Sequence, residues 1–209
     1  MSLKVSENSS GGGISILPEG SYAAVCYMLV DLGLQKNIAY NNSSRKVLIG
    51  WELADEYVEV DGKQQPRVFS TRYTASLNEK AILRRDLAAW RGREFTEAEL
   101  EEFNLCNIVG APCLIQIIHK EGTNGKTYAN LASIMKLPKG MTVPKMTLEP
   151  VIYDIDENDI KDVDKLPEWI ATTVKSSESY QQKLYESRAD EYAPNQFTEL
   201  DDEDGELPF

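Results

Sequence analysis

Basic and aromatic side chains occur together along several apolar stretches of the sequence. In "RVFSTRYTA" (67–75) two arginines alternate with two rings, and similar groups occur near residues 45–51 and 126–128. Cations bind phosphates and flat rings stack on bases, and these two kinds of group together hold an unpaired nucleic-acid strand. The candidate contact residues are Arg45, Lys46, Trp51, Arg67, Phe69, Arg72, Tyr73, Lys126 and Tyr128.

Each candidate also has a purely structural interpretation. Trp51 shares one face of its segment with two aliphatic residues, which favours packing in a core. Phe69 and Tyr73 share a face with an arginine and a threonine, a mixture less typical of a core, so packing and binding stay equally open. A cluster of arginines at 84–93 can pair with neighbouring acids on a solvated helix face instead of binding a ligand.

Two short segments resemble known ion-binding motifs, but one departs from its motif in spacing and the other in residue type. "GTNGKT" (122–127) contains the end of a phosphate-binding loop, but only two residues separate its glycines, where four are needed. "DIDENDIKDVDK" (154–165) starts like a calcium loop, but Asp159 occupies the glycine position and Lys165 the position of the bidentate glutamate. We expect neither a nucleotide site nor a calcium site.

The residues that most often carry catalysis do not form a recognisable set. The single histidine, His119, lies inside an apolar stretch, and the three cysteines lack metal-ligand spacing. No carboxylate pair can be singled out by spacing. We therefore expect no enzyme activity, no metal and no cofactor, and reduced, packed thiols typical of a cytoplasmic protein.

Apolar periodicity predicts the elements that would position the candidates. Apolar residues at alternate positions predict strands, and helical spacing between the third and fourth strands predicts a helix over 78–91, capped by Asn78 and ended by Gly92. Thr96 and Glu99 form a capping box for a second short helix. The predicted strands span 22–32, 46–53, 67–75, 111–120 and 127–137, with a polar loop over 33–44 and hairpin turns at 61–62 and 124–125.

The order of these elements indicates a mainly β fold. Three strands, a helix and two further strands form the layout of a five-stranded OB-fold barrel, although other small barrels share this order. We expect a flexible N-terminus over 1–13, an OB-fold-like DNA-binding domain over 14–150, an acidic and partly helical extension over 151–175, and a disordered acidic tail over 176–209.

Charge is distributed unevenly along the chain. The net charge is −12, but residues 1–150 hold 17 Lys/Arg and 17 Asp/Glu, whereas residues 151–209 hold 5 Lys/Arg and 17 Asp/Glu. A neutral body can present a basic groove even when the whole chain is acidic. No apolar run is long enough to span a membrane, and the first residues lack the apolar segment of a secretory signal.

The last nine residues, "DDEDGELPF", combine five acids with an apolar triplet. A solvated extension is the usual meaning of an acidic run. This one resembles the tail of bacterial and bacteriophage single-stranded DNA-binding proteins, in which acids precede an apolar-Pro-Phe ending. The resemblance implies a tail that binds replication or recombination proteins through Asp201, Asp202, Glu203, Asp204, Glu206, Leu207, Pro208 and Phe209.

The body of the chain carries a second resemblance, over about residues 14–140. "LPEGSYAAVCYMLVDLG", "KVLIGWEL", "RVFSTRYTASLNEKAILRRDLAAWRGREFTEAE" and "NGKTYANLASIMKLPKG" are similar to segments of a phage and prophage family of single-stranded DNA-binding proteins. The resemblance implies a protein that coats single-stranded DNA without sequence preference in the cytoplasm of an infected or lysogenic bacterial host. Residues 151–195 depart from the Gly/Gln-rich linker of the bacterial proteins, so they either fold or mediate self-association, for example as a homodimer.

Two alternatives to DNA coating stay open. One is an adaptor of replication or recombination that binds proteins but not DNA, in which the basic residues of the body are dispensable. The other is a phage enzyme such as a metal-dependent nuclease, for which the sequence shows no ligand cluster.

Overall fold

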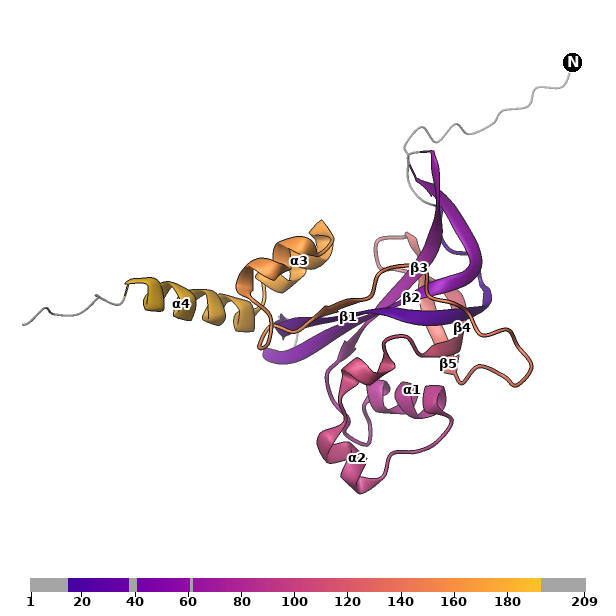
Figure 1. Ribbon diagram of the computed structural model, residues 1–209, viewed down its shortest axis with the longest axis horizontal. Helices are drawn as coiled ribbons and strands as arrows, with labels where there is room; N and C mark the ends of the chain where they lie inside the picture. Colours follow the sequence, from indigo (N-terminus) through magenta and orange to yellow (C-terminus); the bar gives the residue numbers. More distant parts are fainter. Residues whose placement is uncertain (1–14, 38–40, 61, 193–209) are drawn as a thin grey trace, which may run out of the picture.

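A computed structural model describes residues 15–37, 41–60 and 62–192 of the chain. Its main element is one curled antiparallel sheet with the strand order β3-β2-β1-β4-β5 (Figure 1). A short sixth strand pairs with β1. The strands are β1 (Gly20–Asn37), β2 (Asn42–Val60), β3 (Lys63–Thr74), β4 (Pro112–Glu121), β5 (Thr127–Met135) and β6 (Val151–Tyr153). The chain is therefore mainly β, as the alternating apolar pattern predicts.

β1 is the central strand and is buried on both faces. It pairs with β2 along most of its length, while its other edge pairs first with β4 and then, at Met28–Val30, in parallel with β6. Register shifts after Cys26 and after Asp31 change which face the later side chains join. Ala24 and Cys26 pack on one side of the sheet and Val30 and Leu32 on the other, so the single alternating face predicted for 22–32 is wrong.

The first face of the sheet is covered by short helices between β3 and β4. These are α1 (Ile82–Arg91), α2 (Glu97–Glu102) and the 3-10 turn η2 (Leu105–Ile108). Trp90 of α1 packs against Trp51 of β2 with ring centroids 5.9 Å apart, and Phe69 stacks on Trp51 at 6.3 Å. This aromatic group holds α1 against the sheet.

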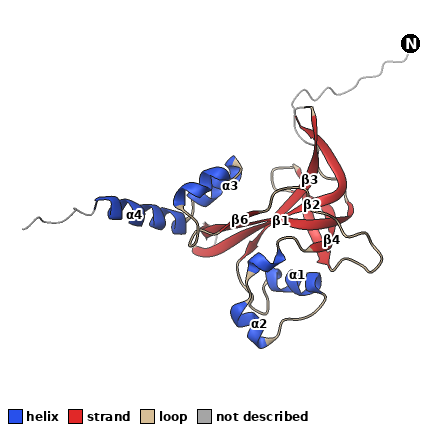
Figure 2. Cartoon of the chain, in the orientation of Figure 1, coloured by secondary structure: helices blue, strands red, loops and turns tan. Residues whose placement is uncertain are grey.

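The opposite face is covered by the C-terminal part of the described chain. Figure 2 shows α3 (Glu168–Lys175) on the side of the sheet opposite α1 and α2, followed by α4 (Glu178–Tyr192). Before them, the 3-10 turn η3 (Ile160–Lys165) joins β6 to α3. Ile155, Ile170 and Val174 are fully buried against β1. The predicted boundary at residue 150 therefore does not separate two packing units, because both sides share one sheet.

Local sequence signals are confirmed where they act over a few residues. Gly92 ends α1 with φ 72°, and Thr96 and Glu99 form both hydrogen bonds of the capping box on α2. Gly125 adopts φ 71° in the hairpin between β4 and β5, while Asp61, in the other predicted turn, lies outside the described residues. In each confirmed case the signal and its hydrogen-bonding partner are close in sequence.

Three predicted segments differ from the structure. The expected polar loop 33–44 is mostly strand, because β1 and β2 extend to Asn37 and from Asn42 as a polar hairpin arm. The first helix starts at Ile82 after an N-cap residue, Ala81, that makes no side-chain hydrogen bond, so Asn78 is not its cap. Residues 178–192 of the segment expected to be disordered form α4, and the rest of that tail from residue 193 lies outside the described residues.

The segment that fails as a calcium loop holds a lysine ammonium instead. Lys183 of α4 donates from Nζ to the carbonyl oxygens of Ile155, Asn158 and Asp156 at 2.5, 2.7 and 3.3 Å. The three carbonyl oxygens surround one ammonium group. Lys183, which supplies it, is twenty-five residues or more away in sequence. This contact joins α4 to the turn after β6.

We expect Lys183→Met to loosen α4 while leaving the sheet intact. Methionine keeps most of the apolar stem but provides no donor, and hydrogen bonds that involve a charged group contribute about 1.5–3 kcal/mol each before solvent exposure reduces the value. Limited proteolysis should cut the variant within α4 faster than the wild type. Lys161→Met, an exposed lysine of η3, is the control. Equal cleavage rates for all three proteins would contradict this role.

Among the described residues, no helix combines the length and hydropathy needed to cross a membrane.

Candidate nucleic-acid interface

The curled sheet is not closed, and a groove lies between its two edge strands. Edge strand β3 and edge strand β5 do not pair, and a groove of about 1150 Å³ is lined by β3, β4, β5, α1 and the ends of β1 and β2. All four residues Thr71–Thr74 line it. Because successive residues of a strand point to opposite faces, the groove follows the free edge of β3 rather than one face.

The lining of this groove, called here the basic groove, is strongly cationic. Among the residues that the structure describes, its charged side chains are Lys36, Lys46, Arg72, Lys80, Arg85 and Lys120, with one acid, Asp86. Asp86 is nearly buried, accepts a hydrogen bond from the Tyr73 hydroxyl at 3.1 Å and pairs with Arg85 at 2.9 Å. Burial, together with the charge of Asp86, raises the pKa of Tyr73 well above its usual range. The acid is thus neutralised within the groove.

The other five cations have no ion pair with any residue in the part of the chain that the structure describes. Lys46 donates to the Thr74 hydroxyl at 2.7 Å, a neutral partner. Like charges gathered along a hollow raise the local concentration of anions. The basic groove can therefore accept a row of phosphates, although the chain as a whole carries a charge of −12.

The structure brings three of the nine predicted contact residues to this groove. Lys46, Arg72 and Tyr73 line it, but only 6% of Tyr73 is exposed and its hydroxyl is held by Asp86. Trp51 and Phe69 stack on each other in the core with 0% and 9% of their surfaces exposed. The packing favoured for Trp51 is confirmed, and Phe69 and Tyr73, for which both roles were open, are also packed; the assignment of these three rings as DNA contacts is corrected, because their faces are covered by protein.

Arg45 also takes a structural position. Its guanidinium bonds buried Asp31 of β1 at 2.6 Å, and Asp156 and Asp154 after β6 at 2.6 and 3.6 Å. The hydrogen bonds that Arg45 donates to Asp31 are the main cause of a raised Arg45 pKa. A guanidinium surrounded by three carboxylates is poorly placed to bind a phosphate, so its prediction as a DNA contact is corrected: it joins β2 to β1 and to the turn after β6.

The remaining predicted residues lie outside the groove lining. Arg67 donates to the carbonyl of Ser15, which holds the N-terminal segment against β3. Lys126 and Tyr128 belong to the hairpin between β4 and β5. Tyr128 pairs across the strands with Lys120, so it is on the same side of the sheet as that groove lysine, and 46% of it is exposed. The eight predicted tail residues, 201–209, lie outside the described residues.

Sequence reasoning missed Lys36, Lys80 and Lys120 as members of the groove. Lys36 lies in the stretch expected to be a loop, and Lys120 lies at the end of a predicted strand. The three residues are far apart in sequence, in β1, in the loop before α1 and in β4, and only the tertiary fold brings them to one groove. Lys120 could have been proposed from the sequence, because it directly follows the alternating apolar residues of a predicted strand.

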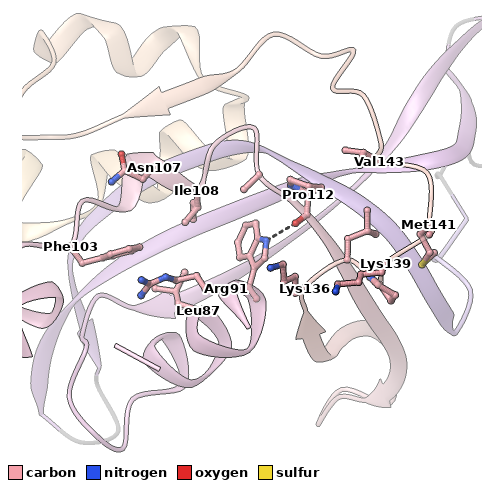
Figure 3. A pocket seen from close by; sticks show the side chains of 15 residues that line it. Leu87, Arg91, Phe103, Asn107, Ile108, Pro112, Lys136, Lys139, Met141 and Val143 are labelled. Carbon is pink, nitrogen blue, oxygen red and sulfur yellow. Dashed lines mark hydrogen bonds between the residues drawn. The ribbon is translucent and has the colours of Figure 1, made fainter. Parts of the chain in front are cut away.

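A second hollow lies on the far side of α1 and is mainly apolar. This pocket has a volume of about 540 Å³, and its lining includes Trp90, Ile108, Pro112, Met141 and Val143. Figure 3 shows it from close by. Trp90 donates from its indole nitrogen to the Pro112 carbonyl at 2.9 Å, which fixes the ring in the wall. Cationic Arg91, Lys136 and Lys139 lie around the apolar lining, so the pocket combines apolar surface with positive charge.

Arg91 is the most constrained of these cations. Its guanidinium lies over the Phe95 and Phe103 rings, 4.3 and 5.4 Å from their centroids, and it is paired with Glu99. A hydrogen bond from Arg93, followed by the backbone bond at Thr96, lowers the pKa of Glu99 to about 2. Of the three cations around the pocket, the two lysines are therefore the ones that could meet a bound anion.

Within the described residues, no group of three or more His, Cys, Asp or Glu side chains could hold a metal ion. Cys26 and Cys113 are buried, and burial raises both thiol pKa values, that of Cys26 to about 12. The ring nitrogen Nε2 of His119 is bonded to the Leu17 carbonyl at 2.8 Å. These groups have packing roles in the structure, and the absence of enzyme activity stays a prediction.

In comparisons with known proteins, the chain matches no family and no curated protein.

Proposed function

We propose that this chain is a single-stranded DNA-binding protein whose basic groove holds the sugar-phosphate backbone. The observation that carries the proposal is the gathering of six cations with a single neutralised acid along the open seam of the sheet. Phosphate contacts supply most of the affinity of sequence-independent binding, which fits a groove built from flexible lysines rather than from rigid base-reading pairs.

The architecture supports the same proposal. The strand order, with a helix between β3 and β4, is compatible with an OB-fold barrel opened between β3 and β5. OB folds commonly bind oligonucleotides along their central strands and adjoining loops. The OB assignment is part of the proposal, and so is coating of about 4–16 nucleotides per fold without sequence preference.

The biological setting is proposed from the sequence resemblances. The chain would act during replication or recombination of phage or prophage DNA in the bacterial cytoplasm. Residues 201–209 would recruit replication or recombination proteins through their acids and the Leu-Pro-Phe triplet, and would compete with DNA for the basic groove. A homodimer would add a second groove per particle.

Fluorescence anisotropy of a labelled dT oligonucleotide tests the proposal. We expect binding that weakens steeply as salt is raised, because each phosphate contact releases counterions. A chain ending at Thr198 should bind more tightly at low salt, because it lacks the competing acids. Absence of binding by both proteins at micromolar concentration would overturn the proposal.

That negative result would favour the second candidate, an adaptor of replication or recombination that binds proteins only. The apolar pocket beside α1 is the observation in its favour. Its apolar lining and its two available lysines match a peptide in which an apolar residue is flanked by acids. Such a peptide would bind the wild type and a variant without the groove lysines equally well.

A further inference from the structure

Trp169 is exposed, unlike the other two tryptophans of the chain. Trp51 and Trp90 are 0% and 6% exposed in the core, whereas 50% of Trp169 is exposed on the outer face of α3. The opposite face of this short helix is anchored by Ile170 and Val174, which are fully buried. Helix packing therefore does not require the exposed ring, and an exposed tryptophan on a fixed helix is available for a ligand.

The ring lies beside the basic groove. The guanidinium of Arg72, a groove residue, lies 5.9 Å from the centroid of the Trp169 ring. Arg72 also donates to the hydroxyl of Thr173 at 3.4 Å, and Thr173 itself lines the groove one turn after Trp169. The groove therefore reaches from the edge of β3 to the face of α3 that carries the ring.

The position of α3 is fixed by the strand that forms one wall of the groove. Gln35 at the end of β1 donates to the carbonyls of Leu32 at 2.6 Å and Thr173 at 3.0 Å. The Thr173 hydroxyl in turn donates to the Trp169 carbonyl at 2.8 Å. Because the bond from Gln35 to the Thr173 carbonyl joins α3 to β1, the helix that carries the ring would need little rearrangement when a ligand binds.

We propose that Trp169 is a stacking platform for an unpaired base at the mouth of the basic groove. With Arg72 over one side of the ring, the other side is left for a base, and the phosphate next to that base would meet Arg72 and Lys46. This inference rests on the proposed function. It adds a contact that distinguishes single strands, whose bases are free to stack, from duplexes. The acidic C-terminal segment then contributes to binding, although its net charge repels DNA.

Intrinsic fluorescence and affinity of two Trp169 variants test this role. A dT oligonucleotide of about 16 nucleotides should quench the emission of the wild-type protein. Trp169→Phe should lose the quenching but keep most of the affinity, since a phenyl ring still stacks. Trp169→Ala should bind the same oligonucleotide about tenfold more weakly, because stacking of one base contributes roughly 1–3 kcal/mol.

An abasic oligonucleotide with the same number of phosphates is the matched control. Trp169→Ala should bind it as tightly as the wild type and with the same salt dependence, because the groove lysines are unchanged. Equal affinity of Trp169→Ala and wild type for dT, or equal losses with and without bases, would overturn the stacking role. In either case salt-sensitive binding by the wild type would leave the proposed function standing, whereas no binding by the wild type would remove both.

Discussion

Replacement of Lys46, Lys80 and Lys120 by alanine should lower the affinity for single-stranded DNA by about a hundredfold at 0.1 M salt. Each phosphate contact on a single strand changes the slope of log affinity against log salt by about 0.7, so loss of three contacts should reduce that slope by about 2. The three lysines come from β2, the loop before α1 and β4, and they share only the basic groove. Anisotropy titrations at several salt concentrations measure both quantities.

A matched triple variant separates groove contacts from general charge. Lys63, Lys145 and Lys161 are exposed and do not line the groove, and their replacement by alanine removes the same total charge. This control should lose only a small part of the affinity. If both triple variants lost the same affinity and the same salt slope, binding would depend on net charge and the groove would have no special role. Circular dichroism would confirm that both variants are folded.

The second large effect is expected at Gly33, where β1 meets the start of α4. Gly33 has φ +72°, and an added Cβ would lie 2.5 Å from Ser177 Oγ and 2.7 Å from Ile155 Cδ1. Ser177 is fully buried, and its Oγ accepts the Tyr180 amide at 3.1 Å in the first turn of α4. Gly33→Ala should therefore destabilise the chain by about 3 kcal/mol, from backbone strain of about 1 kcal/mol and overpacking of about 2 kcal/mol.

Thermal unfolding measures this loss, with Gly125→Ala as the control. Gly125 has a similar φ of +71°, but nothing lies within 4 Å of its added Cβ, so it reports backbone strain alone. For a chain of this size, about 3 kcal/mol corresponds to a fall in Tm of about 6–12 °C, and the control should show about a third of it. Equal shifts for the two variants would mean that Ser177 and Ile155 do not pack on β1 as described.

The strands and the first-face helices could be predicted from sequence because their signals are local. Alternating apolar residues identify β2 and β4, and the Thr96–Glu99 box identifies α2 within four residues. α4 gives no such signal, since its apolar residues are sparse and do not form a stripe along 178–192. Contacts distant in sequence hold it instead, among them Lys183 with the turn after β6 and Ser179 with the Leu34 amide at 3.0 Å.

The candidate site was harder to predict than the fold, for the same reason. Rings and cations that alternate along β3 suggested one mixed binding face. In the structure, Phe69 and Tyr73 point to the core, while Arg72 points to the other side of the strand and meets Trp169 of α3. Which face of β3 is covered depends on α1 and α3, and no pattern within residues 67–75 contains that information.

The pairing of β1 with β6 also affects how the chain folds while it is being synthesised. β1 is synthesised first, but its second edge at Met28–Val30 is completed only by residues 151–153, more than 120 positions later. Until then, the apolar side chains that α3 and β6 will cover remain open to other nascent chains. Contacts of such long sequence separation slow folding and expose aggregation-prone strands. A ribosome-bound chain of about 150 residues should therefore be the species that most needs a chaperone.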